Sequence, residues 1–110
     1  ALPIFLRFNP AASFEAVVGQ VPAEPRIDLW EMFVTEAGTI YVADYGRRKV
    51  LTIRTGDTTF MEVLECPGTL RPTAVLVQDR SLYVGMSTWD TGERTGGLYE
   101  YKLPPELQLE

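Results

Sequence analysis

The feature that most constrains the fold of this chain is a pattern of short strand-like segments that repeats after 42 to 46 residues. Three pairs of segments carry the repeat: Tyr41-Val42 with Tyr83-Val84, Phe33-Val34 with Leu76-Val77, and Phe14–Val18 with Phe60–Leu64. A repeat of this length indicates structural units that stack, because each unit leaves an apolar face that a neighbour has to cover.

Nine segments rich in Val, Ile, Phe, Tyr and Thr, each bounded by turn-forming residues, are predicted to be strands. They are Ile4–Phe8, Phe14–Val18, Trp30–Thr35, Thr39–Asp44, Lys49–Arg54, Phe60–Glu65, Ala74–Gln78, Ser81–Met86 and Gly97–Lys102. No segment keeps apolar residues at the helical period, so no helix longer than about two turns is expected. About four strands per unit is typical of a propeller blade, so the predicted fold class is all-β, with antiparallel four-stranded blade-like sheets.

One unit also carries a sequence resemblance. The segment Glu36–Gly46, followed by Lys49-Val50-Leu51, resembles the NHL repeat in its Gly turn, its aromatic-Val-Ala-Asp strand, its short polar turn and its basic-Val pair. The likeness covers residues 36–53 well and 70–86 less well, and over 4–19 it is only a pattern. The resemblance implies a β-propeller that binds protein or RNA, as most of that family does, although a minority are metal-dependent enzymes.

The sequence departs from the NHL pattern at two places. The polar turn has Arg47 and Lys49 where the family usually has Asn and then Arg. The second unit has Met86 at the position of Asp44, which breaks any ring of carboxylates of the kind that could hold a metal. This second departure, together with the absence of His, counts against the alternative that the chain is a fragment of an NHL-like lyase or lactonase.

Lettering the strands of a blade a to d from the inside outward gives the order c-d, a-b-c-d, a-b-c. The predicted division is therefore a half blade at 1–19, a linker at 20–27, an NHL-like blade at 28–69 and a second blade at 70–110, with room for strand d beyond Pro105. A closed ring needs at least about four blades, so this open propeller cannot close by itself. Ala1 at the start fits either a processed chain or a piece of a longer one.

The composition argues against several functions. The net charge of −5 disfavours nucleic-acid binding, and the one basic run, Arg47-Arg48-Lys49, is interpreted as a solvated turn. The sequence has no His, which removes the commonest general base and transition-metal ligand. Its single cysteine, Cys66, forms no intrachain disulfide and is interpreted as a buried apolar residue. No apolar run approaches the roughly 20 residues that span a bilayer, so a soluble protein of unknown compartment is expected.

Residues that could support chemistry have simpler structural interpretations. Asp44 is predicted to accept turn N–H groups and to neutralise a nearby cation such as Lys49, rather than to bind a metal. The segment Asp90–Arg94 lacks the alternating oxygen ligands of a calcium loop. No serine has the surroundings of a nucleophile, and no phosphate-binding loop is present. No enzymatic activity, cofactor or metal is expected.

Incomplete blades leave bare sheet faces and edges that something must cover. The cover is expected to be another protein chain, missing blades of the same chain, or further copies in a homo-oligomer. The predicted function is a non-enzymatic interaction or scaffold module, the alternative being an accessory structural subunit of a larger complex. Trp89, in a predicted loop insertion between the last two strands, either packs locally or anchors a partner. The predicted partner-binding residues are Phe14, Val18, Trp30, Trp89, Asp90 and Arg94.

Alternate residues of a strand point to one face, so a single apolar set is expected to form most of the core between blades. The members of that set are Phe33, Ile40, Val42, Val50, Ile53, Val63, Val75, Val77, Leu82 and Val84.

Overall fold

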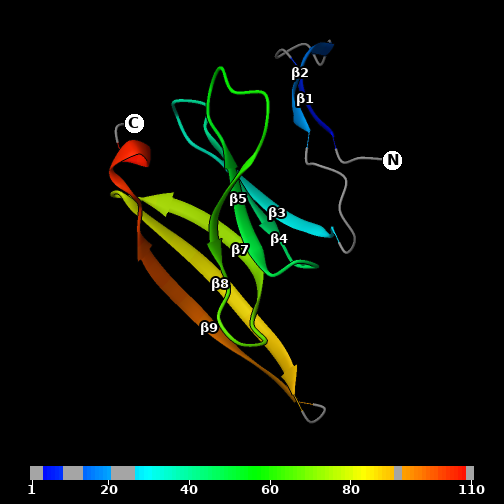
Figure 1. Ribbon diagram of the computed structural model, residues 1–110, viewed down its shortest axis with the longest axis vertical. Coiled ribbons are helices and arrows are strands. Elements are labelled where there is room, and N and C mark those ends of the chain that lie inside the picture. Colours follow the sequence, from blue (N-terminus) through cyan, green and yellow to red (C-terminus); the bar gives the residue numbers. More distant parts are fainter. Residues whose placement is uncertain (1–3, 9–13, 21–26, 91–92, 109–110) are drawn as a thin grey trace.

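The computed structural model describes residues 4–8, 14–20, 27–90 and 93–108 (Figure 1). The strands are β1 (Ile4–Phe8), β2 (Phe14–Gln20), β3 (Leu29–Val34), β4 (Ile40–Asp44), β5 (Lys49–Ile53), β6 (Met61–Glu65), β7 (Arg71–Gln78), β8 (Ser81–Asp90) and β9 (Glu93–Lys102). One short 3₁₀ helix, η1 (Pro105–Leu107), follows them. The predicted all-β class is confirmed.

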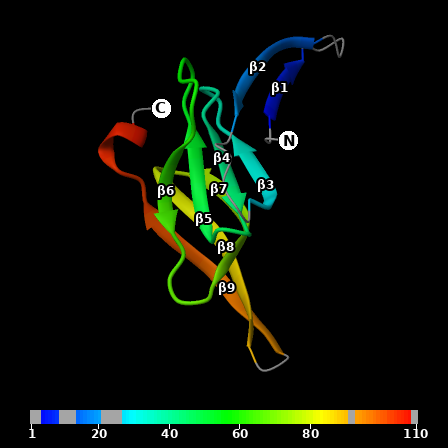
Figure 2. The ribbon, with the colours of Figure 1, turned by 45° about the vertical axis from the view of Figure 1, so that its right-hand side comes forward.

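The strands form sheets in strict chain order. β1 pairs with β2, β3 to β6 form a four-stranded antiparallel sheet, and β7 to β9 form a three-stranded antiparallel sheet. Neither of the two larger sheets closes into a barrel, so both have free edges. The β1–β2 hairpin lies apart from them in Figures 1 and 2.

Tight turns connect the strands and set their register. Asp79 and Arg80 both have positive φ, 51° and 66°, between the paired residues Gln78 and Ser81. Two consecutive positive φ values in a two-residue loop match the twist of a β-hairpin. In the β3–β4 turn, Gly38 has φ +91°, and a Cβ placed there would lie 2.9 Å from Thr55 Oγ1. The turn therefore needs glycine for its backbone angle as well as for space.

The main core lies between the two larger sheets, which face each other with β7 packed against β3 and β4 (Figure 2). We call these two facing surfaces the inner faces and the opposite surfaces the outer faces. The four-stranded sheet contributes Tyr41, Ala43 and Val50 to this core. The three-stranded sheet contributes Val75, Leu82, Val84 and Met86, and Leu103 and Leu107 close one end.

A second, smaller cluster lies on the outer face of the four-stranded sheet and contains Ile40, Val42, Leu51, Ile53 and Phe60. The prediction that Ile40, Val42 and Ile53 belong to the core between the units is therefore wrong, although all three are buried. The residues between the sheets are the alternating ones, beginning with Tyr41. β4 is a central strand with both faces covered, so apolar character alone could not indicate which face was which.

The other members of the predicted core are placed as expected. Val50, Val75, Leu82 and Val84 are buried between the sheets. Phe33, Val63 and Val77 are partly buried against the same cluster.

The last sheet differs from the prediction in two ways. β8 and β9 extend to Asp90 and back from Glu93, so the predicted loop around Trp89 is largely a two-stranded ribbon. The segment from Pro105, where the sequence left room for a fourth strand, forms η1 over Pro105–Leu107, and Leu107 inserts into the core there. Two successive prolines disfavour a paired strand, because neither has an N–H to donate. Within the described residues, no helix has the length and apolar character needed to cross a membrane.

Candidate functional site

The outer face of the three-stranded sheet carries Leu98, the most exposed large apolar side chain among the residues that the structure describes. On this face Leu76 lies opposite Tyr83, and Gly85 lies opposite Leu98. Leu76 is 42 % exposed and Leu98 is 71 % exposed. Isolated exposed apolar residues are ordinary, but a group on one sheet face indicates a surface that can bind another chain.

Charged residues border this surface along one side. Glu100 lies opposite Tyr83 and accepts hydrogen bonds from Ser81 Oγ at 2.7 Å and from the Tyr83 hydroxyl at 3.4 Å. The Ser81 hydrogen bond is the main reason that the pKa of Glu100 lies below its usual value, and Lys102 lowers it further. An apolar patch with a polar border is the usual form of a protein-binding surface.

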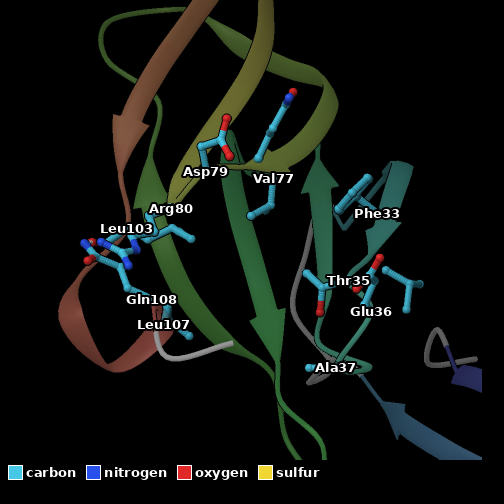
Figure 3. A pocket seen from close by; sticks show the side chains of 12 residues that line it. Phe33, Thr35, Glu36, Ala37, Val77, Asp79, Arg80, Leu103, Leu107 and Gln108 are labelled. Atoms are coloured by element: carbon cyan, nitrogen blue, oxygen red, sulfur yellow. Dashed lines mark hydrogen bonds between the residues drawn. The ribbon is translucent and has the colours of Figure 1, made fainter.

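A cleft of about 600 Å³ opens at the end of the two sheets where the β3–β4 and β7–β8 turns meet (Figure 3). Its lining is partly apolar, with charged residues from both turns: Phe33, Val34, Thr35, Glu36, Ala37, Val77, Gln78, Asp79, Arg80, Leu103, Leu107 and Gln108. Leu103 N donates to Arg80 O at 3.1 Å, which joins the end of β9 to the β7–β8 turn. A cleft of this size and lining can receive a side chain or short peptide segment.

Trp30, a predicted partner-binding residue, is 50 % exposed at the edge of the four-stranded sheet. Its ring stacks on Tyr45 with centroids 4.1 Å apart and an angle of 16° between the planes. Arg71 covers the same Tyr45 ring at 5.4 Å from its centroid and donates to Tyr45 O and Gly46 O at 2.9 and 3.0 Å. Arg71 therefore clamps β7 to the β4–β5 turn of the other sheet, an inter-sheet contact that the sequence did not indicate.

Asp44 is fully buried at the end of β4 and organises the β4–β5 turn. Its Oδ1 accepts from Asp28 N at 3.1 Å and from Arg47 N at 3.2 Å. The prediction that Asp44 accepts turn N–H groups is confirmed. Its cation is Arg47, with Nε 2.5 Å from Oδ2, whereas Lys49 pairs with Glu62 at 2.8 Å.

The basic run is less solvated than predicted. Arg48, half-buried, donates to Cys66 O at 3.5 Å and to Gly68 O, and pairs with Glu65 at 3.7 Å. Because all three basic side chains of the run contact protein groups, they do not form an open cationic patch. Within the residues that the structure describes, no group of three or more His, Cys, Asp and Glu side chains is placed to hold a metal.

Cys66, just after β6, is buried in the main core as predicted. Burial raises the pKa of its thiol from 9.0 to about 11, against the smaller opposing effect of Arg48. At pH 7 the folded chain should therefore hold about 100-fold less thiolate than the unfolded chain. We expect Ellman's reagent to react with Cys66 at least that much more slowly in buffer than in denaturant.

The same shift predicts a dependence of stability on alkaline pH. The unfolded thiol ionises at the lower pH, so this contribution to stability is complete below pH 9 and is lost as the pH rises toward about 11.

The control for the reaction with Ellman's reagent is a Cys66→Ala, Thr69→Cys variant, whose cysteine is at an exposed position and should react rapidly when the chain is folded. Equal rates for Cys66 in buffer and in denaturant would contradict the burial.

The remaining predicted partner-binding residues lie on strands, but the structure does not describe their side chains. Phe14 and Val18 lie on β2, with Phe14 opposite Phe8. Trp89 and Asp90 lie on β8, opposite Arg94 and Glu93 of β9. The structure thus brings Trp89 and Arg94 together as a cross-strand pair and places Trp30 on a different sheet. The apolar surface at Leu76 and Leu98 was missed, although Leu98 follows two glycines in a strand-like segment.

In comparisons with known proteins, no family model, no curated protein and no solved structure matches this chain.

Proposed function

We propose that this chain is a non-enzymatic protein–protein interaction module, built from propeller-type blades that resemble NHL repeats. The observation that supports this function best is the exposed apolar outer face of the three-stranded sheet, with Leu98 71 % exposed on the edge strand β9. The corresponding inner-face position of the neighbouring sheet is Val50, which is fully buried because another sheet covers it. Covering the outer face in the same way would remove comparable apolar area from water.

The chain's charge is consistent with a protein partner rather than a nucleic acid. A net charge of −5 repels a phosphate backbone on average, and the basic run is engaged in contacts within the chain. The face itself combines aliphatic side chains, a tyrosine and a charged border, which is the composition of a protein interface.

Site-specific photo-crosslinking tests this function. A photoreactive benzoylphenylalanine at Leu98, in cells that produce the chain, is expected to form adducts with protein. The matched control carries the same group at Thr58, which is also exposed but lies in the β5–β6 turn. Protein adducts at position 98 and not at 58 support the function. No protein adduct at 98, or equal adducts at both positions, contradicts it.

A further inference from the structure

The chain already makes one sheet-to-sheet contact, and its geometry defines what a second contact of the same kind requires. The edge strand β7 packs on the inner face of the four-stranded sheet, mainly against β3 and β4. Val75 and Val77 are the β7 side chains that belong to this contact, and Phe33 and Tyr41 are among those that receive them.

The strand pairings show that β3 occupies in the four-stranded sheet the edge position that β7 occupies in the three-stranded sheet. Val75 and Val77 of β7 lie opposite Val84 and Leu82 of β8. Met32 and Val34 of β3 lie opposite Val42 and Ile40 of β4 in the same way. Since directly opposed residues share a face, Met32 and Val34 occupy on the four-stranded sheet the positions that Val75 and Val77 occupy on the three-stranded one.

The surface on which β7 packs, which we call the receiving face, also has a counterpart on the three-stranded sheet. On the four-stranded sheet Phe33 lies opposite Tyr41, and Ala43 lies opposite Val50. On the three-stranded sheet the matching pairs are Leu76 with Tyr83, and Gly85 with Leu98. The outer face of the three-stranded sheet therefore has the layout of a surface that receives an edge strand in this molecule.

Both halves of this second contact are uncovered. Met32 and Val34 are each 51 % exposed, although the residues opposite them on β4 are buried. On the receiving side, Leu98 is 71 % exposed where the equivalent Val50 is 0 % exposed. The chain thus carries, one on each of its two larger sheets, complementary halves of a contact that it already makes once internally.

We propose that a second copy of this chain docks on the outer face of the three-stranded sheet by its β3 edge, with Met32 and Val34 against Leu76, Tyr83 and Leu98. This inference rests on the proposed function, because it identifies the partner of the same apolar face. The contact joins different surfaces on the two copies, so it is head-to-tail and either closes into a ring or continues as a chain.

The second contact lacks one element of the first. Arg71, which clamps β7 to the carbonyls of Tyr45 and Gly46, is replaced at the corresponding position before β3 by Asp28. The covalent connection between the sheets is also absent between copies. The association is therefore weaker than the internal packing and depends on protein concentration.

The experiment uses two variants of the full chain, each of which removes one half of the contact. Met32→Glu disrupts the docking edge, and Leu98→Glu disrupts the receiving face. Both positions are at least half exposed, so circular dichroism and thermal melting should show an intact fold. Sedimentation velocity up to about 1 mM should show oligomers of the wild-type chain and at least about tenfold weaker association of each variant alone. Thr58→Glu should associate like wild type.

Mixing the two variants is the decisive measurement. Met32→Glu keeps an intact receiving face and Leu98→Glu keeps an intact edge, so the mixture should form a dimer and nothing larger. A monomeric wild-type chain over the whole range overturns the inference. So does a Met32→Glu variant that still associates alone, which would indicate face-to-face pairing. If crosslinks at position 98 lead to a different protein while the chain stays monomeric, the proposed function stands and this inference fails.

Discussion

Replacing Leu82 with alanine is expected to lower the free energy of unfolding by about 3 kcal/mol. Leu82 is fully buried near the start of the central strand β8, between Val77 and Tyr101, in the core that joins the two sheets. Its truncation removes apolar contacts and leaves a cavity that the surrounding strands cannot fill without shifting. Urea denaturation followed by circular dichroism measures the change.

The matched control for this prediction is Leu76→Ala. Leu76 has the same side chain on the neighbouring strand, but it points to the outer face and is 42 % exposed. Its truncation in the monomer is expected to cost less than about 1 kcal/mol. Equal losses for the two variants would mean that the inner and outer faces of the three-stranded sheet have been assigned wrongly.

Replacing Asp44 with alanine is also expected to destabilise the chain by about 3 kcal/mol. The substitution leaves the Arg47 guanidinium, 10 % exposed, without its carboxylate, and it removes the acceptor of the Asp28 and Arg47 amides. For a chain of this length the melting temperature should fall by about 15 °C. Thermal unfolding followed by circular dichroism is the measurement.

Glu62→Ala is the control, since Glu62 also pairs with a basic side chain, Lys49, at 2.8 Å. Both partners of that pair are substantially exposed to water, so its loss should cost less than about 1 kcal/mol. If Asp44→Ala melts within a few degrees of Glu62→Ala, the buried carboxylate does not hold the β4–β5 turn.

The sequence predicted the strands better than their faces. All nine predicted strands are present, because turn-forming residues mark their ends and the apolar runs are short. β4 could not be oriented from its sequence, since Ile40 to Asp44 are all buried and even its charged residue, Asp44, does not face solvent. The packing of β7 against β3 and β4 decides which residues lie between the sheets, and packing between distant strands leaves no local signal in the sequence.

The candidate site was harder to predict than the fold. Trp89 was predicted to lie in a loop because the residues around it include Gly and Thr. The structure instead continues the β8–β9 pairing on both sides of Trp89. The sequence does not indicate that Leu76 and Leu98 are exposed, which depends on how the sheets pack. The Arg71 clamp depends on the approach of β7 to the β4–β5 turn, a contact between residues 25 and 26 positions apart.

The strand order has a consequence for how the chain folds. Every strand of the two larger sheets pairs only with its neighbours in the sequence, so each pairing closes a short loop. The contact order is therefore low for an all-β protein, and each sheet can assemble from successive hairpins before the two sheets dock. Such an arrangement also lengthens readily by gene duplication, because an added unit brings its own hairpins and leaves the existing pairings unchanged.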